Sequence, residues 1–227
     1  QVGDVGKFVG DGFEFVVPDT QKDGQLIVHE GHLARGILKE GAKVRAIVDE
    51  KRRAGIRRAH SATHILHYAL QKNLGSHAQQ QGSKVDEDWL RFDFTNLSPV
   101  SAEQLAAIQA DVAARVAAKE PVKWEILPLA EARKQGAMML FGEKYPDPVR
   151  MVSMGGFSRE LCGGTHLTNT GEVAAFELLA EEGVSAGTRR ITAVTGEGAE
   201  RFRESIHSVG LAAAKLLNAA PTALADG

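Results

Sequence analysis

Cysteine and long apolar runs are scarce in this sequence of 227 residues. The chain contains one cysteine, Cys162, which excludes an intrachain disulfide and fits a reducing compartment such as the cytoplasm. No apolar run approaches the roughly 20 residues that a membrane-spanning helix needs. Residues 1–30 also lack a basic head followed by an apolar signal core. We therefore expect a soluble cytoplasmic protein without a membrane partner.

Neither sign of charge is in large excess, because the formal net charge is −2. The overall balance therefore gives no attraction to nucleic acid. Basic charge is concentrated locally instead: the segment KRRAGIRR, residues 51–58, contains five Lys and Arg residues. Such a run can hold phosphates, although a solvated linker or helix face is the commoner explanation.

Short apolar bursts separated by Gly, Asp and Pro fill residues 1–49, a pattern typical of a small antiparallel sheet or barrel. We assign residues 1–50 to a small β-barrel-like domain. Its opening QVGD begins without a preceding turn or a methionine, so we expect Gln1 to be a truncation point within a longer protein.

Helical and strand patterns follow in segregated order. Apolar residues recur at helical spacing from about residue 55 until Gly75 and predict a helix. Three further helices are predicted over 101–118, 129–136 and 198–217. Strands are predicted over WLRFDFTN, VKWEILPL, PVRMVSMG, EVAAFELLAEEGV and GTRRITAVTG. This order predicts an α+β fold with a mixed or antiparallel sheet over residues 51–197, followed by a C-terminal helix and linker over 198–227.

Two residue pairs have the composition of a metal site. The segment RRAHSATHILHYAL places His60 and His64 four residues apart, so both imidazoles project from one face of the first predicted helix. Cys162 and His166 repeat that offset in LCGGTH, where two glycines predict a tight loop. Each pair alone has a commoner structural explanation. Together they form a Cys-His₃ set, which suits one tetrahedral Zn²⁺ ion.

The motifs HSATH, CGGTH about a hundred residues later, and GTRRITAVTG resemble the editing domain of alanyl-tRNA synthetases. The similarity also runs through LGSHAQQQGS, LRFDFTN, GAMMLFGEKY and FSRELCGGTH, and covers essentially residues 1–218. Free-standing alanyl-tRNA editing proteins and the editing domain of threonyl-tRNA synthetases are similar too. The abrupt start and the helical tail favour a full synthetase as the parent, with the rest of its chain as a partner. No aminoacylation core is present in these residues, so we do not expect this chain to charge tRNA.

The resemblance implies a hydrolytic function: cleavage of tRNA(Ala) wrongly charged with serine or glycine. It places the four candidate ligands at the metal positions of the family, with one zinc ion per chain. It also implies that Thr63, Gln80 and Ser83 surround the amino-acid pocket. The plainer interpretations are a buried helix threonine for Thr63 and an ordinary loop glutamine for Gln80.

The acceptor end of tRNA(Ala) must also be held. Basic residues adjoin the two motif regions and are candidates for phosphate contact, with surface or carboxylate pairing as the alternative: Arg57, Arg58, Arg189 and Arg190. An oligomer through the C-terminal region is a further expectation.

The chemistry leaves several alternatives open. Four protein ligands would fill the coordination sphere of the metal, which would then only position the substrate or backbone donors. Three protein ligands and a water would instead permit direct activation of that water. Serine exceeds alanine by one hydroxyl, which an apolar pocket rejects by only about a hundredfold, so polar groups must require that hydroxyl. Two other functions are a non-catalytic zinc-stabilised RNA-binding module and a hydrolase with Cys162 as its nucleophile.

Overall fold

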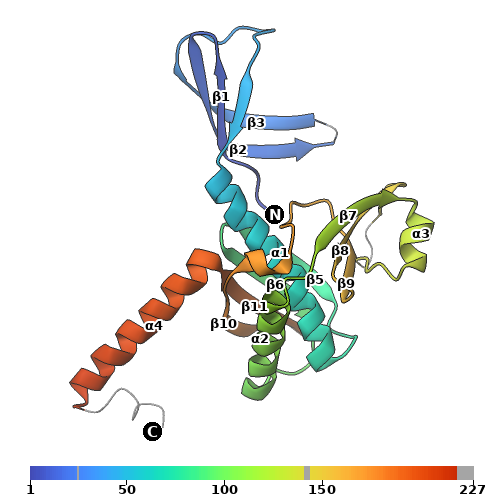
Figure 1. Ribbon diagram of the computed structural model, residues 1–227, viewed down its shortest axis with the longest axis vertical. Helices are drawn as coiled ribbons and strands as arrows, with labels where there is room; N and C mark the ends of the chain where they lie inside the picture. Colours follow the sequence, from blue (N-terminus) through green and yellow to red (C-terminus); the bar gives the residue numbers. More distant parts are fainter. Residues whose placement is uncertain (25, 141–143, 219–227) are drawn as a thin grey trace.

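The computed structural model describes residues 1–24, 26–140 and 144–218. A long central helix connects an N-terminal sheet to two further sheets, and a C-terminal helix projects away from them (Figure 1). Helices and antiparallel sheets are combined in one chain, which confirms the predicted α+β class. No helix among the described residues is long and apolar enough to cross a membrane.

The N-terminal sheet is fully antiparallel, in the order β3-β2-β1-β4. Its strands are β1 (Gly6–Gly10), β2 (Phe13–Asp23), β3 (Leu26–Arg35) and β4 (Arg45–Val48). Phe13 and Val17 are buried, whereas every described residue of β3 is exposed. This sheet therefore buries little apolar surface of its own among the described residues.

Helix α1 (Glu50–Leu74) carries the apolar spacing that predicts a helix before Gly75. Asp49 caps its first turn, because the Asp49 side chain accepts a hydrogen bond from the backbone N–H of Arg52. Gly75 ends it with a φ of 113°, a conformation that favours glycine. Ile56, Leu66 and other apolar residues along one side of α1 are completely buried, so most of the helix is held in a fixed position.

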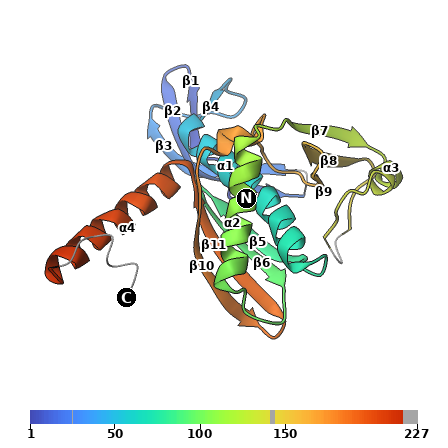
Figure 2. The ribbon, with the colours of Figure 1, turned by 60° about the horizontal axis from the view of Figure 1, so that its bottom comes forward.

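The central sheet is antiparallel, in the order β10-β11-β6-β5. Its strands are β5 (Gln80–Asp86), β6 (Trp89–Thr95), β10 (Phe176–Ser185) and β11 (Thr188–Thr195). Helices α1 and α2 (Ala102–Ala117) lie across this sheet (Figure 2). Alternation along β6 turns Leu90, Phe92 and Phe94 into the core, where all three are completely buried.

A smaller sheet has the order β7-β8-β9 and is also antiparallel. Its strands are β7 (Val122–Leu127), β8 (Val149–Met154) and β9 (Ser158–Leu161), and helix α3 (Leu129–Lys134) packs against it. The 3₁₀ helix η1 (Thr170–Val173) and helix α4 (Gly196–Leu216) complete the described elements.

Strands β5 and β9 are absent from the predicted strands. Only Val85 is buried in β5, so this polar segment lacks the apolar alternation that identifies a strand; β6 supplies its hydrogen-bonding partner. Gln80 therefore begins a strand and does not lie in a loop. Two segments of the predictions lie outside the described residues: 141–143 of the GAMMLFGEKY motif, and 219–227 of the C-terminal linker.

Candidate functional site

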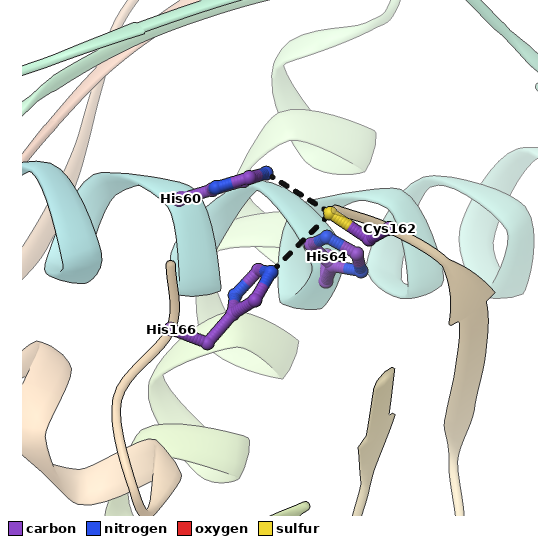
Figure 3. Close-up of side chains that lie close together, drawn as sticks. All are labelled: His60, His64, Cys162 and His166. Carbon is purple, nitrogen blue, oxygen red and sulfur yellow. Dashed lines mark hydrogen bonds between the residues drawn. The ribbon is translucent and has the colours of Figure 1, made fainter. Parts of the chain in front are cut away.

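The four candidate ligands meet at one point, although they come from distant parts of the chain (Figure 3). His60 and His64 project from α1, while Cys162 and His166 lie in the loop after β9. One ligand atom from each residue lies within 4.8 Å of the other three. Cys162 Sγ is 3.5 Å from His60 Nε2 and 3.4 Å from His166 Nε2.

The two sulfur–nitrogen separations fit a tetrahedral ion. With Zn–S near 2.3 Å and Zn–N near 2.05 Å, a tetrahedral angle places sulfur and nitrogen about 3.5 Å apart. The two measured sulfur–nitrogen distances, 3.5 and 3.4 Å, agree with that value. Thiolate and imidazole are also ligands that zinc accepts together. The donor set and its spacing therefore suit a metal ion of the zinc type.

Two side chains contact the Nδ1 atoms of His60 and His166, on the side of each ring away from the cluster. His60 Nδ1 lies 2.8 Å from Gln1 Oε1, and His166 Nδ1 lies 3.3 Å from Ser61 Oγ. When each Nδ1 carries the proton and donates to these oxygens, Nε2 is left with a free lone pair directed at the cluster. The outer contacts therefore favour the tautomer that metal ligation requires.

The two glycines of the CGGTH loop have different structural roles. A Cβ atom at Gly164 would lie 2.0 Å from Cε1 of His60, so only glycine allows this close packing of ring on backbone. At Gly163 no atom lies within 4 Å of such a Cβ, and this residue lines an open cavity. The loop predicted from these two glycines therefore packs against a histidine at Gly164 and borders open space at Gly163.

Glu160 is a component of the site that the sequence analysis did not single out. Its Oε2 lies 3.3 Å from His64 Nδ1, and its Oε1 lies 3.6 Å from His67 Nδ1. Among the described residues, neither Nδ1 forms a well-directed hydrogen bond, so these contacts are mainly electrostatic. Glu160, His64 and His67 are all buried, and Ser158 Oγ donates a 3.1 Å hydrogen bond to Oε1. No strand was predicted over Ser158–Leu161, so the alternation that turns Glu160 toward α1 was not available from the sequence.

Burial and charge set the protonation of the cluster in the absence of an ion. Burial raises the pKa of the Cys162 thiol, but hydrogen bonds from the surrounding histidines outweigh it and lower the pKa to about 2. Burial lowers the pKa of His60, and lowers that of His166 to about 3. Burial also opposes the charge of His64, but Glu160 and the thiolate raise its pKa to about 10. The thiolate and two neutral imidazoles are thus ready to bind metal, and His64 must release a proton first.

A cavity of about 940 Å³ opens beside the cluster. Three candidate ligands and all three residues expected around an amino-acid pocket line it: His60, His64, Cys162, Thr63, Gln80 and Ser83. Thr63 Oγ1 donates a 2.8 Å hydrogen bond to the carbonyl of Ala59, and Gln80 Nε2 donates a 3.2 Å bond to Ser83 Oγ. The structure therefore brings the two predicted groups of residues into one site.

Three of the four arginines proposed for RNA contact are paired with carboxylates. Arg58 makes two hydrogen bonds, of 2.7 and 2.9 Å, to Asp88. Arg190 makes two of the same lengths to Asp93, and Arg189 makes two, of 2.5 and 2.6 Å, to Glu181. The fourth, Arg57, has a buried Nε without a hydrogen-bond partner among the described residues. Carboxylate pairing was the alternative to RNA contact, and RNA contact stays a prediction.

Two comparisons with known proteins agree with the motifs. Residues 149–192 match a family described as the threonyl and alanyl tRNA synthetase second additional domain. Over 209 residues the chain is 56% identical to an alanine–tRNA ligase of Rhodopirellula baltica, a match that covers 92% of this chain and 22% of that protein. The chain thus spans about a fifth of the length of this curated relative. Both matches confirm the resemblance to alanyl-tRNA synthetases.

Replacing Glu160 with Gln tests its support of the cluster, because the change preserves the side-chain shape and removes the negative charge. We expect the affinity for Zn²⁺ to fall roughly 10- to 100-fold, the usual effect of removing a partner behind a metal-binding imidazole. Competition with a chromogenic chelator measures that affinity. Glu125→Gln, an exposed carboxylate on β7, is the matched control. Equal zinc affinities in the two variants would remove Glu160 from the site.

The arginine pairs generate a second prediction. Arg58→Gln leaves the Asp88 carboxylate, which is 4% exposed, without its cation. We expect the free energy of unfolding in urea to fall by about 3 kcal/mol. Lys51→Gln removes a charge from the same helix but breaks only an exposed ion pair with Glu197, so its cost should stay within about 1 kcal/mol. An Arg58 variant as stable as the Lys51 variant, with weaker and less salt-dependent tRNA binding, would instead favour RNA contact.

Proposed function

We propose, from the premise that this chain is similar to one region of alanine–tRNA ligases, that it hydrolyses the aminoacyl ester of tRNA(Ala) wrongly charged with serine or glycine. The observation that carries the proposal is the cavity: candidate metal ligands and hydroxyl or amide side chains face the same open space. An ion with a purely structural role would need no such space. The placement of these side chains beside the candidate ligands supports hydrolysis, and the experiment below separates it from the non-catalytic RNA-binding module.

We further propose one Zn²⁺ per chain, held by His60, His64, Cys162 and His166. Bound zinc supplies Lewis-acid chemistry, by polarising a carbonyl or a water molecule, only where one coordination position is open or exchangeable. All four candidate ligand atoms lie within 4.8 Å of one another, which supports a site of four protein ligands; three ligands and a water is the alternative. With four protein ligands, the ester and the attacking water are oriented by the surrounding side chains of the cavity.

Thr63, Gln80 and Ser83 are suited to select serine over alanine. The Thr63 hydroxyl donates its proton in a hydrogen bond to the Ala59 carbonyl. The Thr63 oxygen is therefore left as an acceptor for a substrate hydroxyl. Alanine cannot fill that acceptor, and each unpaired polar group costs roughly 1–3 kcal/mol. The same argument does not extend to glycine, whose hydrolysis rests on the family resemblance.

In the competing assignment, Cys162 Sγ is the nucleophile of a hydrolase and not a metal ligand. A Cys-His hydrolase needs one imidazole beside its thiolate. Cys162 Sγ instead lies within 3.5 Å of Nε2 atoms of two histidines, and a third ligand atom, from His64, completes the cluster. Several imidazoles converging on one sulfur support metal binding better than nucleophilic catalysis.

The partners follow from the same premise. We infer that the acceptor end of tRNA(Ala) enters the cavity and that the remaining chain of a synthetase adjoins this region. Helix α4 exposes Ile206, Val209 and Leu216, which supports a contact of the C-terminal region with that chain or with a second copy. The divisions at residues 50 and 197 stay predictions.

The decisive experiment measures zinc content and the hydrolysis of Ser-tRNA(Ala) by the purified chain. We expect hydrolysis that a chelator abolishes and added Zn²⁺ restores, and Cys162→Ala should lower both the zinc content and the rate. Ala-tRNA(Ala), which should be cleaved much more slowly, serves as the control substrate. Binding without hydrolysis would favour the RNA-binding module. Hydrolysis that survives the chelator but is abolished by thiol alkylation would favour Cys162 as the nucleophile.

Thr63→Val tests the selection of serine, because valine keeps the branched shape and removes the hydroxyl. We expect the ratio of kcat/KM for Ser-tRNA(Ala) to that for Ala-tRNA(Ala) to fall about tenfold or more. Thr188→Val, in β11 and outside the cavity lining, is the matched control. An unchanged ratio in the Thr63 variant would exclude this hydroxyl as a selector.

A further inference from the structure

We propose that the backbone N–H of Gly163 donates a hydrogen bond to the carbonyl oxygen of the ester as negative charge develops there, and that Arg150 is the positioning residue that directs this N–H. The inference rests on the proposed function and deepens it, because it names the group that stabilises the charge formed during hydrolysis. The sequence analysis did not single out Arg150, and Gly163 entered it only as one of two glycines that predict a tight loop.

Hydrolysis of an ester needs a group that stabilises negative charge on the carbonyl oxygen. The oxygen of water bonds to the carbonyl carbon, and one electron pair of the C=O bond moves to the carbonyl oxygen. When that pair returns, the bond to the ribose oxygen breaks. One proton of the water ends on the ribose oxygen, and the other stays on the carboxyl group until it ionises. Around a metal with four protein ligands no coordination position is open to the carbonyl oxygen, so the protein must supply a donor.

Arg150 on β8 holds the loop after β9 through two backbone carbonyls. Its Nη1 donates to the Cys162 carbonyl at 2.7 Å and to the Gly164 carbonyl at 2.9 Å. The guanidinium also lies over the ring of Trp124, with Cζ 5.0 Å from the ring centroid, which is a favourable cation–π contact. An aromatic ring thus helps to hold the side chain that orients the loop.

The direction of the Gly163 N–H follows from this contact. In a trans peptide unit, the carbonyl and the next N–H point in roughly opposite directions, and the bond between Cys162 and Gly163 is trans. The Cys162 carbonyl is directed at Arg150. The Gly163 N–H is therefore directed away from Arg150.

The peptide unit between Gly164 and Thr165 has the same arrangement and shows which side this is. The Gly164 carbonyl accepts from Arg150, and the Thr165 N–H donates to Gln1 Oε1 at 2.9 Å. That oxygen also lies 2.8 Å from His60 Nδ1. The side of the loop away from Arg150 is therefore the side on which the histidine cluster lies.

The Gly163 N–H is available to a ligand. Within residues 1–24, 26–140 and 144–218 it has no hydrogen-bond acceptor, and Gly163 is exposed. Gly163 lines the same cavity as Cys162 and Thr63. Because glycine has no side chain, it presents only backbone atoms to that cavity. This N–H is thus a directed donor beside the candidate ligands, of the kind that stabilises an oxyanion.

Replacing Gly163 with glycolic acid tests the donor directly, because the backbone amide becomes an ester and only the N–H is removed. With the zinc-loaded chain we expect kcat for Ser-tRNA(Ala) to fall about 100-fold, the usual effect of removing one oxyanion donor, and KM to change by less than about threefold. The same replacement at Gly156, an exposed glycine between β8 and β9 and outside the cavity lining, is the matched control. Metal analysis should give the wild-type zinc content for both.

Arg150→Gln tests the positioning role. Loss of the guanidinium frees both carbonyls to turn, so we expect kcat to fall about tenfold or more while KM and zinc content stay near the wild-type values. Arg150→Lys keeps a cationic donor and should recover part of the loss. Arg159→Gln, an exposed arginine on β9 outside the cavity lining, is the matched control. A fall in zinc content in proportion to kcat would make Arg150 a support of the metal ligands and overturn its role in directing the N–H.

Binding of a charged analogue gives a measurement that needs no turnover. In a phosphonate analogue of 3′-seryl adenosine, a tetrahedral phosphorus with a negatively charged oxygen replaces the ester carbon, whereas in the amide analogue that carbon stays planar and neutral. We expect the wild type to bind the phosphonate at least about tenfold more tightly than the amide. The glycolic acid replacement at Gly163 should remove most of that preference, and the replacement at Gly156 should leave it unchanged.

Equal kcat values for the two glycolic acid proteins, with an active wild type, would overturn the inference and leave the proposed function standing. A phosphonate preference that is the same with and without the Gly163 N–H would also overturn it, and water would then be the ordinary partner of this exposed group. Failure of the proposed function shows differently: the wild type would not hydrolyse Ser-tRNA(Ala), although its preference for the phosphonate still depended on the Gly163 N–H.

Discussion

The contact between helix α1 and the loop after β9 is the constraint on which the site depends. Ser61 on α1 accepts a buried 3.1 Å hydrogen bond from the backbone N–H of Leu167. From the other side, Arg150 Nη1 donates to the carbonyls of Cys162 and Gly164 at 2.7 and 2.9 Å. The loop is thus tied to the helix and to β8 by bonds that involve no ligand atom. A metal ion would join groups already in position, so the core should survive metal removal better than a zinc finger, whose fold requires its metal.

Charge balance explains why a buried carboxylate stands behind the cluster. One thiolate and three neutral imidazoles leave a divalent ion with a net charge of +1, which is costly in a buried site. The Glu160 carboxylate, 9% exposed, brings the sum to zero. Without an ion, the proton on His64 compensates part of the same negative charge, as its raised pKa shows. The Glu160 carboxylate therefore balances charge in the site with a metal ion and in the site without one. Its position between two histidines is consistent with that role in charge compensation.

The sequence was sufficient for the features that depend on local spacing. Periodicity predicted α1 and its end at Gly75, and the two four-residue offsets predicted the cluster of candidate ligands, because residue type and spacing carry those signals. Contacts between distant segments carried no such signal. Arg58 and Arg190 meet carboxylates 30 and 97 positions away, so local sequence shows no partner for their charges. Glu160 in SREL resembles a solvent-facing strand residue until β9 is known to pack against α1.

The small sheet determines how the two ends of the cavity are related. Alternate residues of β8 enter two apolar clusters: Val152 and Met154 join the core around α1, while Val149 and Met151 join the cluster around α3. Strand β9 continues this division, since Glu160 faces the histidines of α1 and Leu161 packs with the α3 cluster. One sheet thus forms a shared wall between the ligand cluster and the segment that carries Met138. Because packed layers resist deformation, the sheet holds the ligand cluster and the segment that carries Met138 at a fixed separation.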